Sequence, residues 1–250
     1  DTRVIAKGLS NSTGVTYHDG DLYFSEVNSI WKIPNIDEAL STSEQMPEKV
    51  LVTNNLPSDT WHGWKWIDFG PDNKLYVPVG APCNICNPSL EEKYNFDKRY
   101  ASIMRLNDGK WEYVARGVRN TVGFDWHPKT NNLYFGDNGR DWMGDDMPSC
   151  ELNVVKNDDS FYGYPYKHSM DVLDPEYSKK IPDNAEEFID PILELGAHVA
   201  PTGLSFYDGD HFPAKYKNTL FMTLHGSWNR SRKVGYKVIA VHFDENGELL

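Results

Sequence analysis

The sequence has few of the features that cross-link a chain or carry it through a membrane. Its 250 residues include three cysteines, Cys83, Cys86 and Cys150, so disulfides are not its main source of stability. The Cys83-Cys86 spacing suits either a loop disulfide or half of a zinc site. The disulfide is favoured because no second ligand pair completes a metal cluster. No apolar stretch approaches the roughly 20 residues that a membrane-spanning helix needs, so no membrane span is expected.

Positive charge is also scarce. Lys and Arg number 25 against 37 Asp and Glu, which gives a formal net charge of -12, and the basic residues form no run. A nucleic-acid partner requires basic groups that neutralise its phosphates, so none is expected. Large rings, by contrast, are plentiful, with 14 Tyr and 8 Trp. A chain this rich in aromatic residues folds around a sizeable core.

Helical periodicity is nearly absent, and only residues 36–40 and 183–188 suggest short helical turns. Instead, one hairpin unit occurs four times. It consists of an alternating segment that ends in an aromatic residue, a turn, a Leu-aromatic pair and a further strand-like segment. The pairs begin at Leu22, Leu75, Leu133 and Leu220. Repeated units with several strands apiece are typical of propeller blades, with the extra length in loops.

The sequence therefore predicts an all-β β-propeller with about four blades. A β-sandwich has similar strands but gives no reason for the repeated unit. The aromatic residues that end the four alternating segments are expected in the blade cores; they are Tyr17, Phe69, Trp126 and Phe206.

Unusual polar residues cluster where the blades begin. They are His62 with Lys65, Arg119 with Asn120, the segment 137–141, His198 and the segment 225–230. In a propeller the first strand of each blade lines the central channel, and the adjoining loops form one mouth. These residues are therefore expected to converge on a single concave site.

Several segments, in order along the chain, resemble one enzyme family. They are "WHGWKWIDFGPDNKLYVPVGAPCNIC", "RGVRNTVGFDWHP", "GDNGRDWMGDD", "YGYPY" and "HGSWNRS". From about Gly8 to Asp244 the chain resembles the sorbosone dehydrogenase branch of the soluble pyrroloquinoline quinone (PQQ)-dependent sugar dehydrogenases. The resemblance implies a six-bladed ring longer than this chain, so residues 1–250 are expected to form a single partial propeller domain. It also implies a periplasmic or extracellular location.

The resemblance assigns roles to residues in two of these segments. The family's channel histidine falls on His62, which is thereby implied to be a general base; a neutral imidazole can take the proton of a sugar hydroxyl as hydride leaves the same carbon. The family's Arg-Asn pair falls on Arg119 and Asn120, implied to contact the quinone and to stabilise negative charge on its reduced oxygen. Lys65 and Arg230 are further candidates for binding the cofactor, Arg230 as a partner of its carboxylates.

The resemblance also implies a calcium ion that bridges to the cofactor. Its ligands would be the backbone carbonyls of Gly139 and Arg140, since hard oxygen donors suit calcium. Asp145, Asp146 and Glu151 follow closely and would bind this ion or a second, structural one.

Two functions from different classes remain open. The first is a PQQ- and calcium-dependent dehydrogenase that oxidises a sugar or sugar aldehyde and passes electrons to an acceptor such as a cytochrome or the quinone pool. The second is a non-redox propeller, either a calcium-dependent lactonase or a carbohydrate- or protein-binding module. A lactonase would take calcium ligands from several blades, whereas the acidic residues here gather in one loop after Tyr134, which disfavours it.

Overall fold

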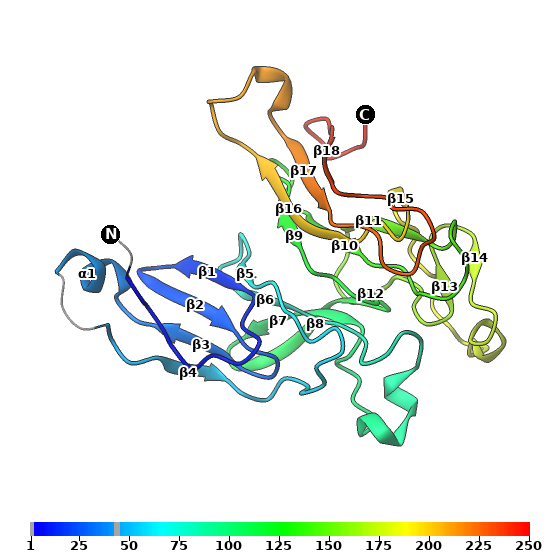
Figure 1. Ribbon diagram of the computed structural model, residues 1–250, viewed down its shortest axis with the longest axis horizontal. Helices are drawn as coiled ribbons and strands as arrows, with labels where there is room; N and C mark the ends of the chain where they lie inside the picture. The colour runs from blue at the N-terminus through cyan, green and yellow to red at the C-terminus, as the bar shows by residue number, and fades with distance from the viewer. Residues whose placement is uncertain (1–2, 43–45) are drawn as a thin grey trace.

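The computed structural model describes residues 3–42 and 46–250 and consists mainly of antiparallel sheets that follow one another in an arc (Figure 1). The first sheet contains β1 (Val15–His18), β2 (Asp21–Ser25), β3 (Ile30–Ile33) and β4 (Val50–Thr53). The second contains β5 (Asp68–Phe69), β6 (Leu75–Val79), β7 (Ser102–Asn107) and β8 (Lys110–Arg116), with β12 (Ser160–Phe161) parallel to β8.

The third sheet contains β9 (Phe124–Trp126), β10 (Leu133–Asp137), β11 (Ser149–Val155) and β15 (Leu193–Ala197), and the fourth β16 (Pro201–Tyr207), β17 (Thr219–Leu224) and β18 (Lys237–Val241). A small hairpin of β13 (Lys167–His168) and β14 (Val172–Leu173) lies in the connection between β11 and β15. The helical elements are short: α1 (Ile36–Ser41), η1 (Pro88–Leu90), η2 (Glu92–Tyr94), η3 (Ser178–Lys180) and η4 (Ala214–Tyr216).

Each sheet is one of the predicted repeat units, so the expectation of a β-propeller with about four blades is confirmed. The Leu-aromatic pairs all lie in the second strand of their sheet, opposite the alternating segment in the first. In the first hairpin, Asp19 and Gly20 take positive φ angles of 47° and 83°. These angles make the two-residue turn that matches the twist of paired strands.

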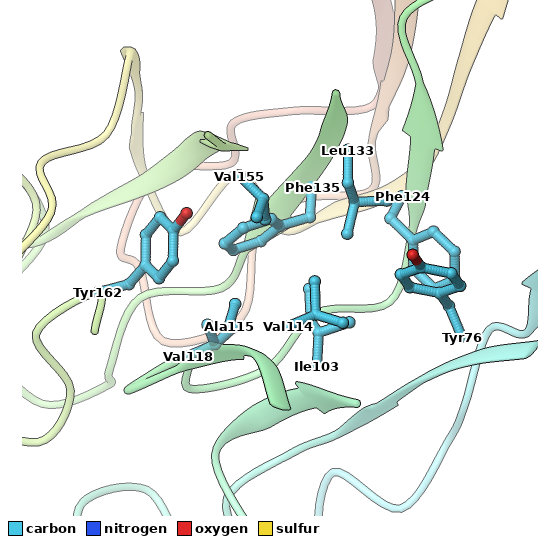
Figure 2. Packing of buried hydrophobic residues seen from close by; sticks show 10 residues of the cluster. All are labelled: Tyr76, Ile103, Val114, Ala115, Val118, Phe124, Leu133, Phe135, Val155 and Tyr162. Carbon is cyan, nitrogen blue, oxygen red and sulfur yellow. The ribbon is translucent and has the colours of Figure 1, made fainter. Parts of the chain in front are cut away.

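The hydrophobic core lies between neighbouring sheets. The cluster in Figure 2 joins residues of β6, β7 and β8 to residues of β9, β10 and β11, with Ile103 and Phe135 fully buried. Equivalent clusters join the first sheet to the second and the third to the fourth. Face-to-face packing of adjacent blades brings their first strands together: β1 contacts β5, and β9 contacts β16. The loops at the ends of these strands therefore meet around one axis.

Two local expectations were wrong. Residues 183–188 form no helix, whereas the turn expected at 36–40 is α1. Tyr17 is 55% exposed because its side chain faces outward, where its hydroxyl donates to Asp37. Phe69 and Trp126 pack against the inter-sheet clusters, and Phe206 is buried in one. Across the described residues, no helix has the length and apolar character to span a bilayer.

Candidate active site

Residues from the second, third and fourth sheets line one cavity of about 370 Å³. Its walls are formed by Thr60, His62, Gly63, Trp64, Asn120, Val122, Asn138, Thr202 and His225. The sequence thus correctly brings His62 and Asn120 together, although 58 positions separate them. A larger cavity of about 460 Å³, between Tyr113, Arg116 and Phe161, contains none of the predicted site residues.

His62 is held in a strained backbone conformation with one ring nitrogen engaged. Its φ is 48°, a region that residues with a side chain adopt at a cost. A Cβ on Gly80 would lie 2.6 Å from the Cβ of His62, so only glycine permits this close approach. Nδ1 lies 2.7 Å from the carbonyl oxygen of Ala81. A carbonyl only accepts, so Nδ1 carries the proton of the neutral ring and Nε2 keeps its lone pair.

Burial sets the charge of this imidazole. Burial, together with the nearby positive charge of Arg119, lowers the pKa of His62 to about 3, and the Ala81 carbonyl opposes the shift only in part. His62 is therefore neutral at pH 7, with Nε2 free to accept a proton. That protonation state is the one a general base requires.

Arg119 is buried, and protein groups surround its guanidinium. Nε donates to the backbone oxygen of Asn84 and Nη2 to its Oδ1, both at 2.9 Å, while Nη1 donates to the carbonyl of Asn138 at 3.0 Å. Asp141 is more distant, with Oδ2 at 3.5 Å from Nη2. This geometry lets Arg119 act on the cavity through its charge, as its effect on His62 shows. Direct contact with a cofactor stays a prediction.

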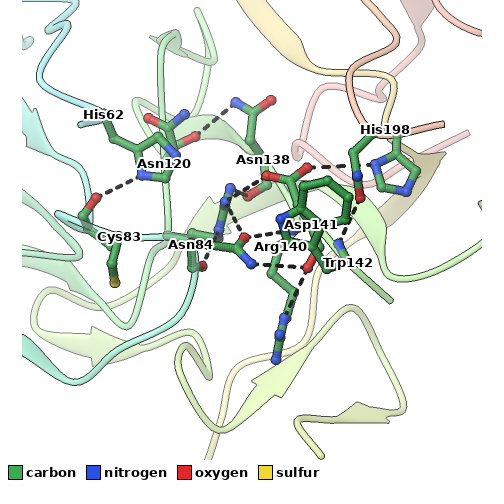
Figure 3. Close-up of polar contacts among 12 residues, drawn as sticks. His62, Cys83, Asn84, Asn120, Asn138, Arg140, Asp141, Trp142 and His198 are labelled. Carbon is green, nitrogen blue, oxygen red and sulfur yellow. Dashed lines mark hydrogen bonds and ion pairs between the residues drawn. The ribbon is translucent and has the colours of Figure 1, made fainter. Parts of the chain in front are cut away.

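The adjoining residues tie three sheets together. The Asp137 carboxylate, at the end of β10, accepts the backbone N–H groups of Arg119 and Asn120 at 2.8 and 2.6 Å. Asn138 then donates to the carbonyls of Asn120 and Pro201, at 2.9 and 3.1 Å (Figure 3). The side-chain amide of Asn120 has no partner among the described residues, so it is available to a ligand in the cavity.

Lys65 does not line the cavity. Its side chain is buried, its ammonium donates to the Gly63 carbonyl at 3.0 Å, and burial lowers its pKa to about 8. No carboxylate among the described residues compensates it. Its predicted contact with a cofactor stays a prediction, and its present position gives that contact no support.

The backbone at Gly139 and Arg140 suits the calcium prediction. No described residue donates a hydrogen bond to either carbonyl oxygen. The side chain of Arg140 is occupied elsewhere, in an ion pair with Asp174, whose side chain is fully buried and also lies 3.0 Å from Nε2 of His168. The side chain therefore anchors this segment and leaves the carbonyl oxygens without a protein partner.

The predicted acidic cluster is not assembled. Ser231 donates its N–H to Asp145 at 3.0 Å, and Asp146 pairs with Arg230 at 2.9 Å. Glu151 lies apart on β11, buried, where it accepts the Ser169 N–H at 2.6 Å. Within residues 3–42 and 46–250, no three His, Cys, Asp or Glu side chains are grouped to hold a metal. The loop carboxylates pair with residues that follow β17 while Glu151 lies inside the third sheet, so the structure does not group these three side chains. Their binding to calcium stays a prediction.

Arg230 closes onto the same loop. Its Nη1 donates to the Asp145 carbonyl and its Nη2 to the Asp146 carboxylate, while its Nε is buried without a partner in the described part of the chain. Arg230 therefore joins the third and fourth sheets. Its contact with cofactor carboxylates stays a prediction.

Exposed tryptophans lie on the same loops as the candidate site residues. Four of them are more than half exposed: Trp61 (55%), Trp64 (60%), Trp142 (70%) and Trp228 (67%). Trp64 lines the cavity, Trp61 lies beside the His62 ring at 5.9 Å, and Trp142 and Trp228 lie 6.3 Å apart. Apolar faces and polar amides thus border the same opening.

Comparisons with known proteins agree with this architecture. The TrAA12-like family model matches residues 167–249. A PQQ-dependent sugar dehydrogenase of Hypocrea jecorina is 22% identical over 99% of the chain, and an uncharacterized protein of Borreliella burgdorferi is 39% identical over 96%. The chain spans 63% of the length of each.

Two solved structures share the fold. The holo form of the pyranose dehydrogenase PQQ domain from Coprinopsis cinerea superposes with a TM-score of 0.75 at 18% identity, covering 99% of this chain and 68% of that one. The calcium structure of Trichoderma reesei Carbohydrate-Active Enzymes Family AA12 gives 0.72 at 21% identity, covering 94% and 66%. The chain is a β-propeller related to the soluble PQQ-dependent sugar dehydrogenases.

The described residues fit the cofactors of such PQQ proteins in two respects. A cavity of about 370 Å³ lies in the range of small-molecule sites, roughly 300–1,000 Å³. The unpartnered carbonyls of Gly139 and Arg140 are hard oxygen donors of the kind calcium takes. The basic side chains predicted to bind the cofactor fit less directly. Lys65, Arg119 and Arg230 all donate hydrogen bonds to protein oxygens.

Sequence reasoning missed Asn84 and gave Asp137 no role of its own in the candidate site. Asp137 stood in a segment noted for its polar residues, but its buried carboxylate serves the backbone of Arg119 and Asn120. Asn84 lies in the loop between Cys83 and Cys86, which do form the favoured disulfide. The spacing of Cys83 and Cys86 could have pointed to Asn84, because a disulfide there marks a loop of fixed shape next to the strand β6.

Proposed function

We propose that the chain carries the active-site region of a PQQ- and calcium-dependent dehydrogenase of the sorbosone or pyranose type, which oxidises a sugar or sugar aldehyde. The observation that carries this proposal is His62: a partly buried, neutral imidazole with a fixed tautomer, whose ring belongs to a cavity wall. Relatedness to PQQ-dependent sugar dehydrogenases over nearly the whole chain supports it.

In this proposal His62 acts as the general base. Nε2 takes the proton of the substrate hydroxyl, or of a hydrated aldehyde, as hydride leaves the same carbon. Bound PQQ would supply the two-electron acceptor for that hydride. The charge of Arg119 favours the negative charge that develops beside it, and keeps His62 neutral before the reaction.

The candidate cofactor-binding groups are on two segments. The carbonyls of Gly139 and Arg140 would hold calcium, and the free amide of Asn120 would contact the cofactor or the substrate. We place the enzyme in the periplasm or outside the cell, with a cytochrome or the quinone pool as its electron acceptor.

The mouth of the cavity supports a sugar as substrate. The exposed indole of Trp64 lines the cavity together with Asn120 and Asn138, and the exposed indole of Trp61 lies beside the His62 ring. A sugar has apolar C–H faces and a rim of hydroxyls, so this combination of rings and hydrogen-bonding groups matches its chemistry.

Reconstitution with PQQ and calcium, followed by dye reduction with a panel of sugars, tests the proposal. We expect sugar-dependent reduction that needs both additions and that falls about a hundredfold or more in His62→Ala. His211→Ala, an exposed histidine outside the cavity, is the matched control and should keep the wild-type rate. Wild-type rates in His62→Ala would remove His62 from the chemistry. Failure of PQQ to bind would favour a carbohydrate-binding module instead.

A further inference from the structure

Asn84 connects Arg119 to the segment 138–142 through four hydrogen bonds. Its backbone oxygen accepts from Nε of Arg119, and its Oδ1 accepts from Nη2, both at 2.9 Å. The same Oδ1 accepts the Asp141 N–H at 2.8 Å, and Nδ2 donates to the Asp141 carbonyl at 3.1 Å. One residue thus binds two nitrogens of a guanidinium and both backbone groups of Asp141 (Figure 3).

The position of Asn84 is itself constrained. It lies inside the four-residue ring closed by the Cys83–Cys86 disulfide. The hydroxyl of Tyr164, from the segment after β12, accepts the N–H of Cys86 at 3.1 Å and lies 3.4 Å from Sγ of Cys83. A short covalent ring restricts the backbone freedom of the residues it encloses.

We propose that Asn84 is a positioning residue of the candidate active site, and that the Cys83–Cys86 disulfide holds it there. Asn84 fixes the guanidinium of Arg119, whose charge acts on His62. It also fixes the backbone beside Gly139 and Arg140, whose carbonyls are the candidate calcium ligands. Only the consequence for cofactor binding rests on the proposed function; the structural clamp does not.

Groups of this kind, one contact removed from a bound ion or cofactor, typically change affinity ten- to a hundredfold when they are removed. Asn84→Ala removes all three side-chain hydrogen bonds. Asn84→Asp keeps both acceptor contacts, to Arg119 and to the Asp141 N–H, and loses the donor. Asn87→Ala is the matched control: the same residue type in the same loop, but with its Nδ2 on Tyr166, away from Arg119.

The first measurement is amide hydrogen exchange on the protein without added cofactor. The Asp141 N–H has Asn84 as its partner, so Asn84→Ala should speed its exchange about tenfold. The double variant Cys83→Ser/Cys86→Ser should act in the same direction, and Asn87→Ala should leave the Asp141 amide unchanged. Unchanged exchange in Asn84→Ala would overturn the proposal whatever the cofactor does.

The second measurement is PQQ affinity, followed by quenching of tryptophan fluorescence in the presence of calcium. We expect Asn84→Ala to bind at least about tenfold more weakly, Asn84→Asp to recover most of that loss, and Asn87→Ala to match wild type. Wild-type affinity in Asn84→Ala would overturn the positioning role. If the wild-type chain binds no PQQ, the proposed function fails, and the exchange measurement still decides whether Asn84 holds the segment.

Discussion

Lowering the pH from 7 to 5 should destabilise the wild-type protein relative to a His62→Gln variant. Burial, helped by the charge of Arg119, lowers the pKa of His62 from 6.5 to about 3 in the folded state. Between these two values the unfolded chain binds a proton that the folded protein does not. Stability is therefore lost as pH falls through this window, and it is fully present above pH 6.5.

The size of the effect follows from the two pKa values. At pH 7 both states are largely neutral at His62, and its contribution to the free energy of unfolding is close to zero. At pH 5 the unfolded chain is mostly protonated at this position and the folded protein is not, which costs about 2 kcal/mol. Glutamine does not titrate, so the variant does not carry this loss.

Urea denaturation of both proteins at pH 7, 6 and 5, at constant ionic strength, measures the difference. Comparing wild type with His62→Gln cancels the other titrating groups, including the buried carboxyls of Asp137 and Glu151. We expect the gap between the two free energies of unfolding to shift by about 2 kcal/mol in favour of the variant. Parallel curves would refute the reasoning, because they would mean that His62 titrates in the folded protein as it does in the unfolded chain.

Two further substitutions test neighbouring features. Lys65→Met should raise the free energy of unfolding at pH 7 by about 2 to 3 kcal/mol in urea melts, because burial lowers the pKa of Lys65 to about 8 and its ammonium lacks a carboxylate partner. This gain in stability should shrink as pH rises from 8 to 10. A loss of stability in the variant would show that the ammonium is well compensated. Arg140→Ala should lower the free energy of unfolding by about 3 kcal/mol, because it leaves the buried Asp174 carboxylate without its cation, and an unchanged melt would show that His168 suffices.

The repeat in the sequence was enough to predict the sheets. Turn residues such as Asp19 and Gly20 reflect local backbone geometry, and the Leu-aromatic pairs that follow each turn reflect the alternation of strand faces. Both patterns can be recognised within a few positions of the sequence. The helix expected at 183–188 failed because its apolar residues are too few for one buried face, and Phe188 instead packs beside Phe161. Local pattern therefore determined the blades but not the long connections between them.

The candidate site was predictable only where blades begin. His62 and Asn120 were expected together because first strands of blades share a channel, and they line the same cavity. The pairing of Arg230 with Asp146, 84 positions away, had no such rule behind it. The partners of side chains on long loops are decided only once the sheets have packed. The metal prediction for the acidic loop rested on the resemblance at Gly139 and Arg140 and on the carboxylates that follow closely in sequence.

The electrostatics of the site depend on the contact between the second and third sheets. Asp137 and Glu151 are paired across β10 and β11, and burial raises the pKa of both, that of Glu151 to about 8, with each carboxylate opposing ionisation of the other. The pKa of Glu151 is raised more than that of Asp137, so Glu151 is the carboxyl that keeps its proton to higher pH. Asp137, which accepts the N–H groups of Arg119 and Asn120, is the ionised partner. The buried charge of Arg119 thus has a buried counter-charge supplied by the next blade, so the charge balance beside His62 depends on how the second and third blades pack.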